Sequence, residues 1–142
     1  MTADSEPCRL LLVDDDSTFC QVLGRALSRR GFSVTTAYGG AAALQQAQIE
    51  TPGYAVVDLN LAGDSGLRLI PDLLALQPAI QIVVLTGYAS IATAVEAIKL
   101  GAVNYLAKPA DADQILAAFV TMPGDSIALI NARPLSVNRL QW

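Results

Sequence analysis

The sequence predicts a single α/β domain with a doubly wound sheet of five parallel strands. The chain has 142 residues and 53% of them are hydrophobic, which suffices for one core but not for two ordinary domains. Four nearly continuous apolar runs of strand length alternate with segments of helical periodicity. Such runs are typical of parallel strands buried on both faces, and their alternation with helices implies right-handed crossovers.

The strands are predicted from the apolar runs. In chain order they are Leu10–Val13, Phe32–Ala37, Tyr54–Val57, Ile82–Leu85 and Val103–Leu106. The segment Phe32–Ala37 is weaker than the others, because Ser33 and Thr35 alternate with apolar residues. Alternation of this kind predicts an edge strand.

The helices are predicted between these strands. In the segment STFCQVLGRALSRRG, apolar residues recur at i, i+3, i+4, i+7 and i+8 from Phe19. Ser17 or Asp16 can cap the start of this helix, and Gly31 can cap its end. The other predicted helices are Gly40–Gln48, Leu67–Leu76, Ser90–Leu100 and Ala112–Val120. Asp111 can cap the last of them.

The composition excludes several functions. The chain has no histidine, so it cannot build a histidine-dependent zinc site or a Ser-His or Cys-His nucleophile pair. Nine basic residues against 13 acidic ones give a formal charge of −4, which argues against nucleic acid as a partner of this chain. Cys8 and Cys20 fit no metal-ligand or disulfide pattern, so we expect reduced thiols; a redox-sensing role stays open.

The sequence contains no segment that predicts a membrane partner. The start, MTADSEPCR, is acidic and has no apolar core, so it does not read as a secretory signal. The apolar stretch 82–95 is split by Gly87 and Tyr88 and is shorter than the roughly 20 residues that a membrane-spanning helix needs. The expected location is the cytoplasm.

Polar residues follow four of the predicted strands where each strand ends. Asp14 and Asp15 follow the first strand, Asp58 the third, Thr86 the fourth and Lys108 the fifth. In a doubly wound sheet, ligands bind outside the carboxyl ends of the strands. We therefore expect these five side chains to converge on one site.

The residue types at this expected site favour phosphoryl transfer. Three carboxylates about 5 Å apart repel one another by about 3 kcal/mol per pair at an effective dielectric constant near 20. An all-oxygen cluster recruits a hard cation, Mg²⁺ or Mn²⁺, rather than zinc or copper. Lys108 adds a positive charge and Thr86 a hydroxyl donor, and phosphoryl transfer needs this positioning and neutralisation. Asp58 is then the expected nucleophile, which would become an acyl phosphate.

Four motifs carry a family resemblance: LLVDDD, YAVVDLNLAGDSG, VVLTGY and YLAKPAD. They resemble the receiver domain of bacterial two-component response regulators, over roughly residues 8 to 121. The stretch LTGYASIATAVEAIKLGAVNYLAKPADAD is most similar to the redox-responsive RegA/PrrA/ActR/RoxR group. The resemblance implies a flavodoxin-like or CheY-like (βα)5 fold with strand order 2-1-3-4-5. It also implies a switch that phosphorylates and dephosphorylates itself, rather than a classical enzyme.

The resemblance assigns metal ligands. Asp15, Asp58 and the backbone carbonyl of Asn60 would ligate Mg²⁺ directly, and Asp14 would act through water. Asp16 falls outside this set, and we interpret it as a charge at a helix N-terminus, where the helix dipole favours it.

The resemblance also assigns the switch. Thr86 would bind a phosphoryl oxygen, Tyr105 would swing inward with it, and Lys108 would pair with the phosphate. The peptide bond before Pro109 would be cis. Many receivers carry Met-Pro after the phosphoacceptor where this chain has Leu61-Ala62, which predicts a looser loop and bears on phosphate lifetime.

The implied partner is a sensor histidine kinase that donates its phosphoryl group, and a homodimer that depends on phosphorylation is left open. Residues 1–8 are expected to be an N-terminal tail, 9–121 the receiver domain, and 122–142 a linker with the truncated start of a C-terminal DNA-binding domain. DNA would be bound only through that absent domain. Arg25 and Arg29 lie one turn apart on the first helix, either as a solvated face or as part of a kinase-docking surface.

Two other classes remain as alternatives. A haloacid-dehalogenase-like phosphatase also uses an aspartate nucleophile with Mg²⁺, but it needs a second aspartate where this chain has Asn60, and its acidic pair comes last in the chain. A flavodoxin-like FMN module would need a Ser/Thr-rich phosphate loop after the first strand, and none is present.

Overall fold

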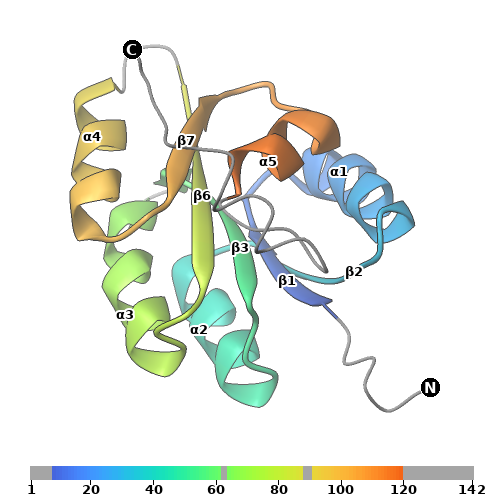
Figure 1. The fold of residues 1–142 in the computed structure, drawn as a ribbon, viewed down its shortest axis with the longest axis horizontal. Coiled ribbons are helices and arrows are strands. Elements are labelled where there is room, and N and C mark those ends of the chain that lie inside the picture. Colours follow the sequence, from blue (N-terminus) through green and yellow to red (C-terminus); the bar gives the residue numbers. More distant parts are fainter. Residues whose placement is uncertain (1–7, 62–63, 88–90, 120–142) are drawn as a thin grey trace, which may run out of the picture.

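The computed structural model describes residues 8–61, 64–87 and 91–119, which form a parallel sheet covered by helices on both faces (Figure 1). The strands of the sheet are β1 (Cys8–Val13), β2 (Phe32–Ala37), β3 (Tyr54–Asp58), β6 (Gln81–Thr86) and β7 (Asn104–Ala107). The helices are α1 (Ser17–Arg29), α2 (Gly40–Ile49), α3 (Leu69–Leu76), α4 (Ile91–Leu100) and α5 (Ala112–Ala118). A short hairpin, β4 (Asn60–Leu61) with β5 (Asp64–Ser65), and a 3-10 turn, η1 (Gly66–Arg68), precede α3.

The topology confirms the predicted fold. The sheet order is β2-β1-β3-β6-β7 and every neighbouring pair is parallel. Counted over these five strands alone, since β4 and β5 lie outside the sheet, this is the order 2-1-3-4-5. β2 lies at an edge of the sheet, as its alternating pattern predicted.

Several element boundaries differ from the predictions. β1 begins at Cys8, which the prediction placed in the tail, and β7 begins at Asn104 rather than Val103. The predicted helix from Leu67 starts instead with η1, because the Ser65 hydroxyl accepts a hydrogen bond from the Leu67 backbone N–H at 3.2 Å and closes a tighter turn. α5 ends at Ala118. The predicted start of the fourth helix at residue 90 and the predicted end of the fifth helix at residue 120 lie outside the described residues.

The helix caps follow the sequence. The Asp16 carboxylate accepts a hydrogen bond from the Phe19 backbone N–H at 3.1 Å and so caps α1, the role expected for Asp16. Gly31, with φ of +100°, follows the end of the same helix. Asp111 and Gln114 form a reciprocal capping box at the start of α5.

The core lies in two layers, because successive strand residues face opposite sides of the sheet. Leu11 and Val13 face the layer beneath α2, α3 and α4, while Leu10 and Leu12 face the layer beneath α1 and α5. Packing on both faces fixes the strands, and therefore fixes the positions of the side chains that follow their carboxyl ends.

An aromatic cluster closes the opposite end of the sheet. The ring of Phe119, directly after α5, lies 4.9 Å from the ring of Tyr54 and 6.4 Å from that of Phe32. Tyr54 and Phe32 are the first residues of β3 and β2. The end of α5 is therefore anchored at the amino ends of the strands.

Candidate functional site

Three carboxylates meet at the carboxyl edge of the sheet. Asp14, Asp15 and Asp58 each offer an oxygen, and these oxygens lie within 4.8 Å of one another. Asp14 is fully buried and Asp58 is 3% exposed, whereas Asp15 is exposed. β1 and β3 are neighbours with Val13 opposite Val57, so Asp14, directly after β1, lies beside Asp58, the last residue of β3. The predicted convergence is therefore present for the acidic residues.

Lys108 completes this cluster from the end of β7. Its Nζ lies 3.0 Å from Asp14 Oδ2 and 3.3 Å from Asp58 Oδ2. Its backbone N–H donates to the carbonyl of Thr86 at 2.8 Å, which ties the lysine to the end of β6. The ammonium also lies 4.9 Å from the centre of the Phe19 ring. The bond between Lys108 and Pro109 is cis, as expected.

Burial dominates the electrostatics of Asp58. Loss of solvent raises the pKa of this carboxyl and the charge of Asp14 adds to the rise, while the Asn60 backbone N–H and Lys108 oppose it. For Lys108, burial lowers the pKa, but the hydrogen bond to Asp14 and the charges of Asp58 and Asp14 outweigh it, so the pKa rises. The lysine therefore stays charged beside a carboxylate whose oxygens are more basic than usual.

The segment after Asp58 holds that residue in place. The Asn60 backbone N–H donates to Asp58 Oδ1 at 3.0 Å, and the Gly66 N–H donates to the carbonyl of Leu59 at 3.1 Å. A Cβ on Gly66 would overlap the main-chain oxygen of Asp58. The role of Gly66 was not predicted, because its only signal in the sequence is a lone glycine within DSG. Leu61 is buried in β4, and Ala62 lies outside the described residues.

Thr86 and Tyr105 occupy different environments. Thr86, at the end of β6, is 4% exposed and its hydroxyl donates to the carbonyl of Gly87 at 3.3 Å. Tyr105, on the neighbouring strand β7, is 40% exposed. The hydroxyl thus lies at the carboxyl edge as predicted, and the inward swing of Tyr105 stays a prediction.

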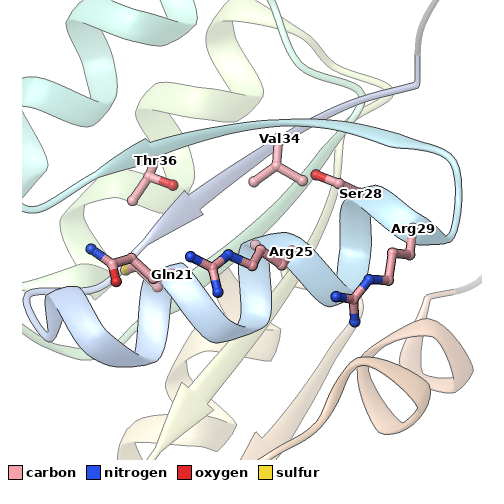
Figure 2. A pocket seen from close by; sticks show the side chains of 8 residues that line it. Gln21, Arg25, Ser28, Arg29, Val34 and Thr36 are labelled. Atoms are coloured by element: carbon pink, nitrogen blue, oxygen red, sulfur yellow. The ribbon is translucent and has the colours of Figure 1, made fainter.

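Two hollows lie on either side of α1. One of about 510 Å³ lies between α1 and β2, and Figure 2 shows Arg25 and Arg29 along it. Neither arginine has a hydrogen-bond or ion-pair partner among the described residues. A smaller, apolar hollow of about 150 Å³ is lined by Phe19, Val22, Leu23, Ala26, Ala110, Asp111 and Ala112. None of the predicted metal-ligand, phosphoacceptor or switch residues lines either hollow.

The donor set at the carboxyl edge fits a hard divalent cation. Three carboxylates face one ammonium, the donors are all oxygens, and the described part of the chain brings no histidine or thiolate donor into the cluster. A doubly wound domain with such a cluster and a lysine at its carboxyl edge is typical of signalling domains that are controlled by phosphorylation. Within the described ranges, no helix is long and apolar enough to cross a membrane.

Comparisons with known proteins identify the family. The model of the response regulator receiver domain matches residues 10–120, and the chain belongs to this family. It is 46% identical to the acid tolerance regulatory protein ActR of Rhizobium meliloti (strain 1021), over 94% of this chain and 68% of the relative. It is 45% identical to the photosynthetic apparatus regulatory protein RegA of Cereibacter sphaeroides, over 94% of this chain and 72% of the relative. These matches confirm the predicted likeness to the RegA/ActR group and leave the phosphatase alternative without support.

Solved structures agree with this assignment. A response regulator from Burkholderia pseudomallei is 53% identical, with a TM-score of 0.74, over 78% of this chain and 65% of that chain. That crystal structure contains a phosphorylated aspartic acid, a calcium ion and citrate. A CheY-like receiver domain from Methanospirillum hungatei JF-1 is 28% identical, with a TM-score of 0.73, over 79% of this chain and 90% of that chain.

Proposed function

We propose that Asp58 is the phosphoacceptor of this receiver domain and that it takes a phosphoryl group from the phosphohistidine of a sensor kinase. The observation that supports this most is the buried Asp58 carboxylate, which faces Asp14 and the Lys108 ammonium at 3.3 Å. An Asp58 oxygen attacks phosphorus, the phosphorus–nitrogen bond of the donor breaks, and the imidazole leaves with that electron pair. The relative from Burkholderia pseudomallei, with its phosphorylated aspartic acid, supports the same chemistry.

Asp14, Asp15 and Asp58, with the backbone carbonyl of Asn60, would hold Mg²⁺ or Mn²⁺, with Asp14 acting through water. A bound divalent cation supplies charge neutralisation for the incoming phosphoryl oxygens. Lys108 supplies a second positive charge beside Asp14 and Asp58, and Thr86 supplies a hydroxyl donor at the same edge. The crystal structure of the Burkholderia relative contains a calcium ion, which is in keeping with a divalent cation in this family.

The kinase would dock beside α1. The apolar hollow between α1 and the start of α5 lies next to Lys108. Phe19 lines this hollow, and the Lys108 ammonium lies over the Phe19 ring. Val22, which lines the same hollow, is 63% exposed and so offers apolar area that a docked kinase would cover. Arg25 and Arg29, on the same helix, would add charge contacts with the kinase.

The chain would act in the cytoplasm as the input part of a longer regulator. ActR and RegA are named as regulatory proteins, and ZraR, a further relative at 38% identity, is a transcriptional regulatory protein. DNA binding would belong to a C-terminal domain beyond this chain. The predicted linker at residues 122–142 lies outside the described residues, and the predicted phosphorylation-dependent homodimer stays a proposal.

Incubation with acetyl phosphate and Mg²⁺, followed by intact-mass spectrometry, tests this proposal. We expect one added phosphoryl group, no addition in Asp58→Asn, and no addition in EDTA. Asp16→Asn is the matched control, since asparagine caps a helix as well as aspartate does, and we expect it to label like the parent chain. Labelling that persists in Asp58→Asn, or full labelling in EDTA, would overturn the proposal.

A further inference from the structure

The outward faces of α2 and α3 form a surface, here named the α2–α3 surface, that carries almost no charge. α2 has no charged residue, and its exposed side chains are those of Ala41, Ala42, Gln45, Gln46, Gln48 and Ile49. The only charged residue of α3 is Asp72, whereas α1 and α4 each expose two charged residues. Depletion of charge is the compositional signal of the buried centre of an interface. Figure 1 shows the two helices side by side on one face of the sheet.

This surface has both a protruding apolar side chain and a groove. Ile49, at the end of α2, is 74% exposed, the largest fraction among the large apolar side chains that the structure describes. Hollows of about 190 and 310 Å³ lie between α2 and α3, and Leu44 and Asp72 line both of them. The two hollows therefore form one groove, which runs from Gly40 near the start of α2 to Leu76 at the end of α3.

Two opposite charges border the groove without a partner. Arg68 and Asp72 lie four residues apart, and neither has a hydrogen bond or ion pair among the residues that the structure describes. The order base before acid is the less favourable one for pairing along a helix. Arg68 also lies at the N-terminus of α3, where the helix dipole disfavours a cation. Neither an ion pair within the described residues nor the dipole of α3 therefore stabilises the positive charge of Arg68.

We infer that the α2–α3 surface binds a second copy of this chain across a two-fold axis, with the helices of the two copies antiparallel. In this arrangement Arg68 of each copy meets Asp72 of the other, so both charges are paired at once. α2 and α3 run in the same direction, because both connect parallel strands on one face. The same axis therefore places α2 of one copy against α2 of the other, so the exposed Ile49 at the end of each α2 lies beside the start of the partner's α2.

A second copy fits this surface better than an unrelated protein. A surface that carries one charge of each sign, one turn apart, is complementary to itself under a two-fold rotation, whereas an acidic or basic partner would leave one of the two charges unpaired. The surface contains neither Asp58 nor the hollow beside Val22. The inference therefore does not rest on the phosphoacceptor role of Asp58 or on kinase docking at α1.

Charge reversal tests this inference in the full chain by sedimentation analysis over a series of concentrations. We expect the parent chain to dimerise, and Arg68→Glu and Asp72→Arg each to be monomeric, since each places like charges across the axis. An equimolar mixture of the two variants should dimerise again, because both contacts then join opposite charges. Lys99→Glu, at an exposed position of α4, is the matched control and should dimerise like the parent chain.

Ile49→Ser provides a second, apolar arm of the test, in which we expect the dissociation constant to rise at least tenfold. Circular dichroism checks that each variant keeps its fold, which is expected because Arg68, Asp72 and Ile49 are all exposed. A parent chain that stays monomeric at every concentration overturns the inference. So does a dimer that survives either single charge reversal, since it must use another face, and so does a mixture of the two variants that stays monomeric.

Discussion

Replacing Gly66 with alanine removes space directly behind the proposed phosphoacceptor. A Cβ at this position would overlap the main-chain oxygen of Asp58, and it would lie 3.0 Å from Val57 Cγ1. The Gly66 backbone has no positive φ, so alanine can adopt its conformation, and the whole effect comes from this overlap. Main-chain atoms of a buried strand move less easily than the tip of a side chain. Gly66→Ala must therefore displace either the end of β3 or the start of η1.

The overlap at Gly66 sets the expected loss of stability. Overpacking of a closely packed core costs about 1 to 3 kcal/mol. At about 2.1 cal/mol/K per residue, the unfolding entropy of roughly 110 described residues is about 230 cal/mol/K, so each kcal/mol lowers the melting temperature by about 4 °C. We expect Gly66→Ala to melt about 4 to 13 °C below the parent chain. The displacement of Asp58 should also slow labelling by acetyl phosphate.

Thermal unfolding followed by far-ultraviolet circular dichroism measures this change. Gly53→Ala is the matched control, because a Cβ at Gly53 meets no atom within 4 Å. This control should melt at the parent temperature or up to about 4 °C above it, since alanine lowers the entropy of the unfolded chain. If Gly66→Ala melts within one or two degrees of the parent chain, the packing argument at Asp58 is wrong.

Three further predictions concern the hydroxyl at the carboxyl edge and the thiols. Thr86→Ala should still accept one phosphoryl group but should lose the NMR shift changes that phosphorylation causes around Tyr105 and α4, and an unchanged response would refute the coupling. Burial, with the charges of Asp14 and Asp16, raises the pKa of Cys20 to about 11, so at pH 8 roughly one Cys20 in a thousand is a thiolate. A thiol reagent should therefore modify Cys8 first and Cys20 only on unfolding; equal rates in the folded chain would contradict the burial. Because the unfolded chain releases the Cys20 proton at a lower pH than the folded chain, stability should fall as the pH rises from 9.0 towards about 11, which denaturant titrations can measure.

The positions of the site residues could be predicted because parallel strands bring their carboxyl ends to one edge. The meeting of Asp14 and Asp58 follows because β1 and β3 are neighbours. The approach of Lys108 follows because β7 lies two places from β3 in the same sheet. Their burial could not be predicted in the same way. Asp14 is fully buried while the adjacent Asp15 is exposed, and this difference depends on how the chain turns after β1.

Features that depend on tertiary packing could not be predicted from the sequence. The close approach of Gly66 to Asp58 joins residues eight positions apart through a hairpin, and no periodic pattern reports it. The start of the third helix was predicted too early, because Leu67 fits the helical period while the Ser65 hydroxyl selects a tighter turn there. The orientation of Tyr105 depends on side-chain packing on β7, which the strand pattern does not contain.

The aromatic cluster at Phe119 limits how phosphorylation can influence anything attached after α5. Tyr54, against which Phe119 packs, and Asp58 are the two ends of β3, about 13 Å apart along the strand. The rings that form this anchor, those of Phe32, Tyr54 and Phe119, carry no charge on which the electric field of an added phosphate could act. A segment that leaves the domain at Phe119 must instead receive the signal mechanically, through displacement of the strands or of α5 against the sheet.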